Sequence, residues 1–291
     1  MGPRLHRLAA LLAVVLGGGG ISQVQAVPAE VFGKHGGNFW GWGSNERGQL
    51  GMSSSAGKMR APTYGSDLWP GWEGVNATKV VVGQPQGQGE FTIVLTLDGR
   101  LFSFGDCRSG TLGVAAEFCS VDNCAAVDSC QKTPQLVDFS AYESETWFPP
   151  TIVDVAAGEK FAVALASNGL VFAWGDGYYN GIANGCCTLA SGCAGCTTYY
   201  TPVLASGLNG AALGNSLPVA IAAGPNFLFV TTDAGGVWVV GTNAKGQLGL
   251  GHTNEIYIPT QNTNLDSPRV IRVGLFHGAA ITKDGAVVVW G

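Results

Sequence analysis

One pattern of apolar positions recurs five times along the chain. A glycine is followed by a run of apolar residues and then by a second glycine six positions later. These runs are apolar on both faces, which is typical of a strand covered on both sides and not of one that alternates between core and water. A fixed segment that recurs at variable distances indicates a repeat architecture. The glycine pairs are Gly37 and Gly43, Gly99 and Gly105, Gly169 and Gly175, Gly235 and Gly241, and Gly285 and Gly291.

Turn residues precede the apolar runs. Asp98-Gly99, Asn168-Gly169 and Asp284-Gly285 predict two-residue hairpin turns, whose positive φ angles suit Asn, Asp and Gly. Within each run, a pair such as Leu101-Phe102 or Val287-Val288 is expected to be buried between neighbouring sheets. Small antiparallel sheets packed face to face in this way are the blades of a β-propeller. The sequence therefore predicts an all-β fold, a β-propeller of four-stranded antiparallel blades with about five repeats.

The repeat resembles that of a known family. Its parts are a D-G turn, V-x-x-W-G, then N-x-x-G-Q-L-G and a later proline, and the polar turn is clearest in residues 44–51 and 242–249. This is similar to the regulator of chromosome condensation repeat, from which the bacterial β-lactamase inhibitor propeller is also built. The resemblance implies a seven-bladed ring, so the five repeats are expected to form a partial, open ring, truncated at the C-terminus.

The resemblance also concerns one buried position. The family often has histidine three residues after the glycine of the inner strand. Here the position holds His277 in the last repeat, but Phe161 and Phe227 in two others. Phenylalanine cannot replace a catalytic imidazole, so the position is interpreted as core packing.

The first 26 residues have the pattern of a signal peptide. Arg4, His6 and Arg7 form a basic start, residues 8–16 are apolar, and Val24-Gln25-Ala26 fits a cleavage site. The apolar run is shorter than the ~20 residues that span a bilayer, although an uncleaved anchor is the alternative. We therefore expect a signal peptide over 1–26, propeller repeats over 27–291, a secreted protein and no membrane span in the chain.

Charge limits the class of partner. The net charge is −5, and charged residues make up 12% of the chain, against about 25% in ordinary globular domains. An acidic chain lacks the basic stripe that nucleic acids require. We therefore expect no nucleic-acid partner.

Two enlarged loops hold every cysteine. An even number of cysteines in an exported chain predicts disulfides, so we expect two per loop, with the pairing left open. A zinc site of four thiolates, with Cys193 and Cys196 as a C-x-x-C pair, is the alternative. The cysteines are Cys107, Cys119, Cys124 and Cys130 in one loop and Cys186, Cys187, Cys193 and Cys196 in the other.

No motif of a known catalytic site is present. The histidines after the leader, His35, His252 and His277, fall in different repeats, and no nucleophile elbow, zinc-protease motif or phosphate loop occurs. Carboxylates such as Glu143 and Asp154 are interpreted as solvated loop charges. We predict no enzyme activity and no catalytic, cofactor-binding or metal-binding residues. Asn76, in Asn76-Ala77-Thr78, is a predicted glycosylation site.

Together these features predict a secreted, non-enzymatic propeller that binds an unidentified protein or glycan through disulfide-stapled loops. Rigid scaffolds concentrate binding function in their loops. The candidate contact residues are the loop tyrosines Tyr178, Tyr179, Tyr199 and Tyr200. The alternative, implied by the resemblance, is a guanine-nucleotide exchange factor for a small GTPase; the leader, the cysteines and the acidity oppose it.

Overall fold

The computed structural model describes most of the chain after residue 39. The described residues are 40–52, 57–64, 76–83, 90–119, 130–143, 150–177 and 197–291, together with the backbone of 10–16 and 25–28.

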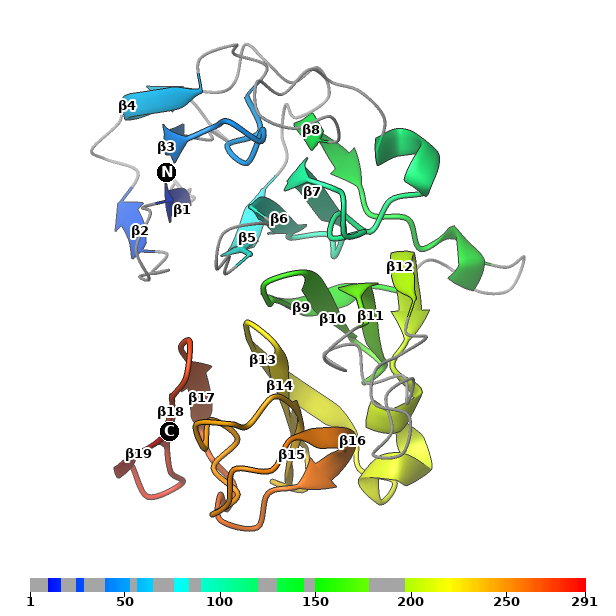
Figure 1. Cartoon of the computed structure of the whole chain (residues 1–291), viewed down its shortest axis with the longest axis vertical. Helices are drawn as coiled ribbons and strands as arrows, with labels where there is room; N and C mark the ends of the chain where they lie inside the picture. The colour runs from blue at the N-terminus through cyan, green and yellow to red at the C-terminus, as the bar shows by residue number, and fades with distance from the viewer. Residues whose placement is uncertain are drawn as a thin grey trace, which may run out of the picture.

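The strands form five sheets that follow one another around a common centre (Figure 1). The first has the order β2-β1-β3-β4, the next three are four-stranded meanders, and the last is three-stranded. Short 3-10 helices lie between strands. The strands are β1 (Ala10–Leu16), β2 (Gln25–Pro28), β3 (Trp40–Ser44) and β4 (Lys58–Tyr64); β5 (Ala77–Val82), β6 (Phe91–Thr96), β7 (Leu101–Asp106) and β8 (Cys130–Leu136); β9 (Ile152–Ala157), β10 (Phe161–Ala166), β11 (Val171–Asp176) and β12 (Thr198–Leu204); β13 (Pro218–Gly224), β14 (Phe227–Thr232), β15 (Val237–Gly241) and β16 (Ile256–Gln261); and β17 (Val270–Val273), β18 (Gly278–Ile281) and β19 (Val287–Trp290). The 3-10 helices are η3 (Ala116–Cys119), η4 (Ser140–Tyr142), η5 (Ser206–Leu208) and η6 (Gly210–Leu213).

This arrangement is a β-propeller, as the sequence predicted. The first strands of neighbouring meanders, β5, β9, β13 and β17, lie next to one another in order. Successive strands within each meander then run outward in antiparallel pairs. The predicted all-β fold class and the number of repeats are confirmed.

The first sheet differs from the other four. Its strand β1 runs parallel to β3, with Ala13 opposite Trp40. Strands β1 and β2 fall on the residues predicted to be the apolar core and the cleavage region of a signal peptide. The removal of residues 1–26 stays a prediction.

The hairpin turns are one residue longer than the sequence predicted. The amide of Thr96 donates to the carbonyl of Arg100 at 2.9 Å, so three residues, 97–99, form the loop. Only the last of them, Gly99, has a positive φ, at 80°. The reason is that a type I turn closed by a left-handed glycine needs one positive φ, whereas the predicted two-residue turn needs two. The same hydrogen bonds recur at the turns of β10–β11, β14–β15 and β18–β19.

The apolar strands form most of the core. Leu101, Val171 and Val237 are buried, and the aromatic residues that follow them are buried or half-buried. In the last repeat the prediction of burial is wrong for Val287, whereas Val288 is half-buried and packs against the core between the fourth and fifth sheets. Val287 and Val289 are 70% and 75% exposed because no described element covers their face of the last sheet. The interpretation of Phe161 and Phe227 as core residues is confirmed, since both are buried.

The closing glycine of each of the last four repeats is required by a close approach of two strands. Gly175 has φ 105°, and a Cβ atom there would lie 2.3 Å from the carbonyl oxygen of Lys160. No other residue fits this contact without moving the backbone, which explains why the sequence repeats a glycine here.

The polar turn after the apolar strand of the fourth repeat is held by its own side chains and docks on the next blade. In the fourth repeat, Asn243 Oδ1 accepts from the amide of Leu248 at 2.9 Å, and Gln247 Oε1 accepts from that of Lys245 at 2.8 Å. The carbonyl of Gln247 then accepts from Trp290 Nε1 of the fifth sheet at 2.8 Å. The repeated tryptophan therefore joins neighbouring blades.

The outer strand of each of the first four sheets carries a bulge with a proline in it. In the third sheet, Ala173 pairs with Val203 and Gly175 with Tyr199, so that three residues of β12 lie opposite one residue of β11. The third of these is Pro202. A proline fits there because a bulge on an outer strand leaves its position without a ladder hydrogen bond to donate. Pro62, Pro134 and Pro259 occupy the same position in the other three sheets.

Candidate binding groove between the second and third sheets

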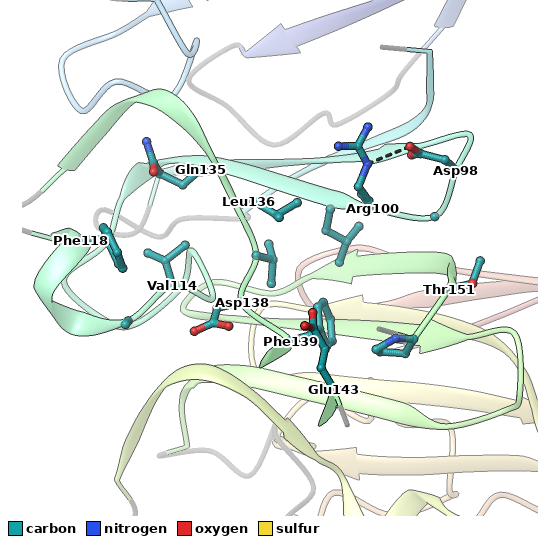
Figure 2. Close-up of a pocket in the computed structure, with 15 residues that line it drawn as sticks. Asp98, Arg100, Val114, Phe118, Gln135, Leu136, Asp138, Phe139, Glu143 and Thr151 are labelled. Carbon is teal, nitrogen blue, oxygen red and sulfur yellow. Dashed lines mark hydrogen bonds and ion pairs between the residues drawn. The ribbon is translucent and has the colours of Figure 1, made fainter. Parts of the chain in front are cut away.

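A cavity of about 670 Å³ opens where the second sheet meets the connection to the third. Figure 2 shows that its lining comes from several segments of the chain. The principal lining residues are Asp98 and Arg100 of the β6–β7 hairpin, Phe118 of η3, Leu136 of β8, and Asp138, Phe139 and Glu143 after β8. We call this cavity the interblade groove.

Two large apolar side chains are exposed at the groove. Phe118 is 55% exposed and Leu136 is 53% exposed. Phe118 lies in the first cysteine loop, one residue before Cys119, so this loop contributes directly to the groove. Exposed apolar groups gathered in a concave site, with a few polar groups around them, are typical of a binding surface.

The groove rests on a rigid aromatic cluster. The ring of Phe139 meets that of Phe172 edge to face at 5.4 Å and that of Trp174 at 6.3 Å. Tyr142 of η4 lies 4.8 Å from Phe172, and its hydroxyl accepts a hydrogen bond of 2.9 Å from the amide of Leu204. The second and third sheets are therefore fixed to one another below the groove.

Carboxylates outnumber cations along the groove. Asp98 Oδ2 pairs with Arg100 Nε at 2.8 Å, and the guanidinium of Arg100 stacks 5.4 Å from the ring centroid of Phe102. The hydroxyl of Thr96, followed by Arg100, lowers the pKa of Asp98. Asp138 accepts from the amide of Ser140 at 2.9 Å, and Glu143 is exposed. Within the described part of the chain, neither Asp138 nor Glu143 is in a salt bridge.

A buried ionic cluster lies at the start of the first cysteine loop. Asp106 is almost fully buried and pairs with Arg47 of the preceding repeat at 2.6 Å and with Arg108 at 2.5 Å. Burial opposes the charged form of Asp106, but the hydrogen bonds from Arg108 and Arg47 outweigh it and hold its pKa below the usual value. Burial raises the pKa of the neighbouring Glu90, to which Gln49 donates a hydrogen bond.

The structure describes three of the eight cysteines. Cys107 and Cys119 are buried free thiols that lie against each other, so the disulfides predicted for them are not formed in this structure. Cys130 is disulfide-bonded, and its partner lies outside the described residues. The other cysteines also lie outside the described residues, and their disulfides stay a prediction. They are Cys124, Cys186, Cys187, Cys193 and Cys196.

Two of the predicted contact tyrosines, Tyr199 and Tyr200, do not line the interblade groove. Tyr199 and Tyr200 of β12 are half-buried and pack against the apolar cores on either side of the third sheet, while Tyr178 and Tyr179 lie outside the described residues. Their role in binding stays a prediction.

The predicted glycosylation site is at the surface. Asn76 is exposed just before β5, and the hydroxyl of Thr78 donates to the carbonyl of Leu95 at 3.2 Å. Its glycosylation also stays a prediction.

Sequence reasoning missed the residues that line the groove. They come from four separate segments, within residues 98–101, 114–118, 135–143 and 150–151, which only the fold brings together. Phe118 alone carried a signal, as a large apolar residue in a cysteine loop; Leu136 reads as an ordinary strand residue.

Within the described residues, no group of three or more His, Cys, Asp and Glu side chains has the geometry of a metal site. Asp154, interpreted from the sequence as a solvated charge, instead forms an ion pair of 2.5 Å with Lys79 between the second and third sheets. Across the same part of the chain, no helix is long and apolar enough to cross a membrane.

Two stretches match the family models of the regulator of chromosome condensation (RCC1) repeat, over residues 152–180 and 234–281. The first match covers β9, β10 and β11 of the third sheet, and the second runs from the β14–β15 turn to the end of β18. The chain is an RCC1-repeat β-propeller. The resemblance seen in the sequence is thereby confirmed.

Known proteins resemble this propeller in sequence or in fold. The human E3 ubiquitin-protein ligase HERC2 is 29% identical over 237 residues, which cover 81% of this chain and 4% of the ligase. The Ultraviolet-B receptor UVR8 of Arabidopsis thaliana is 29% identical over 143 residues, 48% of this chain and 29% of the receptor. Yeast RCC1 (Prp20), solved bound to Kap60, superposes with a TM-score of 0.65 at 22% identity.

The matches cover only part of each relative. The yeast alignment covers 87% of this chain and 52% of the yeast chain, so the RCC1-repeat propeller spans about half of that structure and a small part of the ligase. The matched part of the ligase is its RCC1 repeats. The likeness to yeast RCC1 establishes the fold.

Proposed function

We propose that this RCC1-repeat propeller is an exported, non-enzymatic protein that binds a protein partner at the interblade groove. The observation that supports this most directly is the groove itself, where Phe118 of the first cysteine loop and Leu136 of β8 are exposed beside carboxylates. Propellers are rigid scaffolds, and loops on such scaffolds are common places for recognition.

The groove favours a partner segment that is both apolar and basic. Phe118 and Leu136 offer apolar surface, and Asp138 and Glu143 offer negative charge that no described cation neutralises. The whole chain is also acidic, with a net charge of −5. Complementary charge speeds association and selects among partners. We therefore propose a protein segment with leucine-like side chains next to lysine or arginine.

Export is supported by the leader pattern of residues 1–26 and by the number of cysteines in the remaining chain. The absence of enzyme activity is supported by the groove lining, where the titratable side chains are those of Asp98, Arg100, Asp138 and Glu143. This set has no nucleophile beside a base.

Guanine-nucleotide exchange is the alternative function. Its support is the likeness to yeast RCC1, and at 22% identity that likeness supports the fold and not the activity.

The proposal can be tested with three fluorescent peptides that share one leucine pattern and carry lysine, glutamine or glutamate at the other positions. We expect the lysine peptide to bind most tightly and added salt to weaken it, because salt screens exposed charges. Phe118→Ser and Glu143→Lys should each weaken binding of the lysine peptide by about tenfold, or ~1.4 kcal/mol. Ile258→Ser, which changes an exposed apolar residue on β16, is the matched control and should bind as the wild type does.

Two results would overturn the proposal. One is equal binding of the three peptides by wild type and both groove variants. The other is binding to a glycan array that depends on Phe118 while none of the peptides binds, because the groove would then recognise sugar and not protein.

A further inference from the structure

Two buried thiols face each other beside the interblade groove. Cys107 directly follows β7, and Cys119 ends η3, twelve positions later. The sulfur of Cys107 lies 3.4 Å from the carbonyl oxygen of Cys119, and the sulfur of Cys119 lies 3.6 Å from that of Cys107. The two residues are 0% and 8% exposed. Each sulfur therefore contacts the other cysteine.

We propose that Cys107 and Cys119 are partners in a disulfide that forms in the oxidised protein and clamps η3 against the second sheet. Cys130 pairs with Cys107's neighbour Asp106 in the β7–β8 ladder, but it is already disulfide-bonded. It is therefore not free to compete for either thiol. The pairing follows from the position of the two residues and not from the even number of cysteines.

The two thiols have different roles in the reaction. The thiol of Cys107 hydrogen-bonds to Cys119 and lowers its pKa, while that bond and burial raise the pKa of Cys107. Cys119 is also the more exposed of the two. Because the thiolate is the nucleophile in exchange, Cys119 attacks the oxidant first and Cys107 resolves the product.

The oxidant is a small disulfide such as glutathione disulfide. The Cys119 thiolate attacks one sulfur, breaks the sulfur–sulfur bond and releases one glutathione thiolate. Cys107 loses its proton and attacks the sulfur of Cys119 in this mixed disulfide, releasing the second glutathione. The protein loses two electrons and two protons, and glutathione disulfide becomes two molecules of glutathione.

The disulfide would hold Phe118 in place at the groove. Phe118 is the residue before Cys119, and its carbonyl accepts a hydrogen bond from the side chain of Gln131 on β8. The clamp and this hydrogen bond would fix η3 at both its end and its flank. This consequence for binding rests on the proposed function, whereas the disulfide does not.

Trypsin gives a direct test on the full chain. Cleavage after Arg100, Arg108 and Lys132 places Cys107 on the peptide 101–108 and Cys119 on the peptide 109–132. After incubation with glutathione disulfide, we expect these peptides to be linked, at a mass two hydrogen atoms below the sum of peptide 101–108 and the form of peptide 109–132 that keeps the disulfide of Cys130. Fragmentation of the linked pair should place the bond at Cys119.

Matched variants check the assignment. Cys119→Ser should abolish the link, and Cys124→Ser, on the same tryptic peptide, should keep it. A link that persists in Cys119→Ser, a fragment ion that places it at Cys124 or Cys130, or full alkylation of Cys107 in the oxidised wild type would overturn the inference. The fragmentation result does not depend on whether either variant folds.

A second measurement separates the disulfide from the proposed function. Oxidation should slow amide exchange in residues 109–118 and tighten binding of the lysine peptide by at least about threefold, or ~0.6 kcal/mol. If the linked peptides form while no peptide binds in either redox state, the binding proposal fails and the disulfide stands. If binding is tight and equal in both states, the clamp does not control the groove.

Discussion

At the scale of single residues, the repeated tryptophan and the buried aspartate join neighbouring repeats. The indole nitrogen of Trp174 donates to the carbonyl oxygen of Thr111 in the preceding repeat at 2.9 Å. In the same way, the carboxylate of Asp106 forms an ion pair with Arg47 of the preceding repeat. The sequence shows that these residues recur or cluster, but it cannot show that their partners lie in another repeat.

Replacing Trp174 by phenylalanine should weaken the contact between the second and third sheets. The change leaves the buried carbonyl of Thr111 without its donor, and an unpaired buried polar group costs about 1–3 kcal/mol. We expect this loss in the free energy of unfolding measured with urea. Trp238→Phe, at a half-buried tryptophan of β15, is the control and should cost less. Equal losses in the two variants would contradict the role of the indole hydrogen bond.

Asp106 and Glu90 should change stability with pH in opposite directions. The pKa of Asp106 is lowered in the fold, so its carboxylate stabilises the protein above its unfolded pKa of about 3.9, and this is lost as the pH falls through the folded value. The pKa of Glu90 is raised, so its protonation in acid favours the fold. Asp106→Asn should therefore flatten the loss of Tm between about pH 5 and pH 3, and Glu90→Gln should steepen it. Changes of the same sign in both variants would exclude this account.

At the scale of the strand and turn, the sequence predicted the repeated hairpin but not its details. The apolar run and its two glycines were sufficient to predict the hairpin, because a strand covered on both faces has a recognisable composition. The turn length was wrong because Asp98-Gly99 suits both a two-residue and a three-residue loop. The proline bulges were missed because register depends on which strands pair. The groove residues Phe118 and Leu136 could not be found for the same reason.

Gly175→Ala tests the close approach at the end of the apolar strand. Both Gly175 and Gly285 have positive φ, at 105° and 92°, but only at Gly175 would a Cβ meet backbone, at 2.3 Å. Gly285→Ala carries the conformational cost alone, roughly 1 kcal/mol. Gly175→Ala should cost roughly 1–3 kcal/mol more, because the backbone must also shift. Urea unfolding of both variants measures the difference, and equal costs would show that crowding is unimportant.

At the scale of the whole molecule, each sheet contributes one face to each neighbouring core. One core lies between the second and third sheets and another between the third and fourth, each built from strands of both. The sequence predicted this, since a blade apolar on both faces needs two neighbours. The prediction of export does not follow from the fold. It depends on the leader pattern of residues 1–26.

Export should give a mature protein that begins at Val27. Cleavage after Ala26 would remove β1 and part of β2, leaving β3 and β4 as the described strands of the first sheet. The measurement is intact-mass analysis of the reduced protein recovered from the culture medium and from cells. A chain that keeps Met1 and stays in the cytosol would contradict export and would place the thiols in a reducing compartment.

The prolines in the outer strands have a further consequence. Each outer strand is the last strand of its sheet, and an unpaired row of backbone donors and acceptors can add strands from other molecules. Pro62, Pro134, Pro202 and Pro259 remove one donor from each row, and the bulge around each one turns the backbone away from a straight ladder. Four sheet edges can therefore stand around the rim of one molecule without acting as templates for polymerisation.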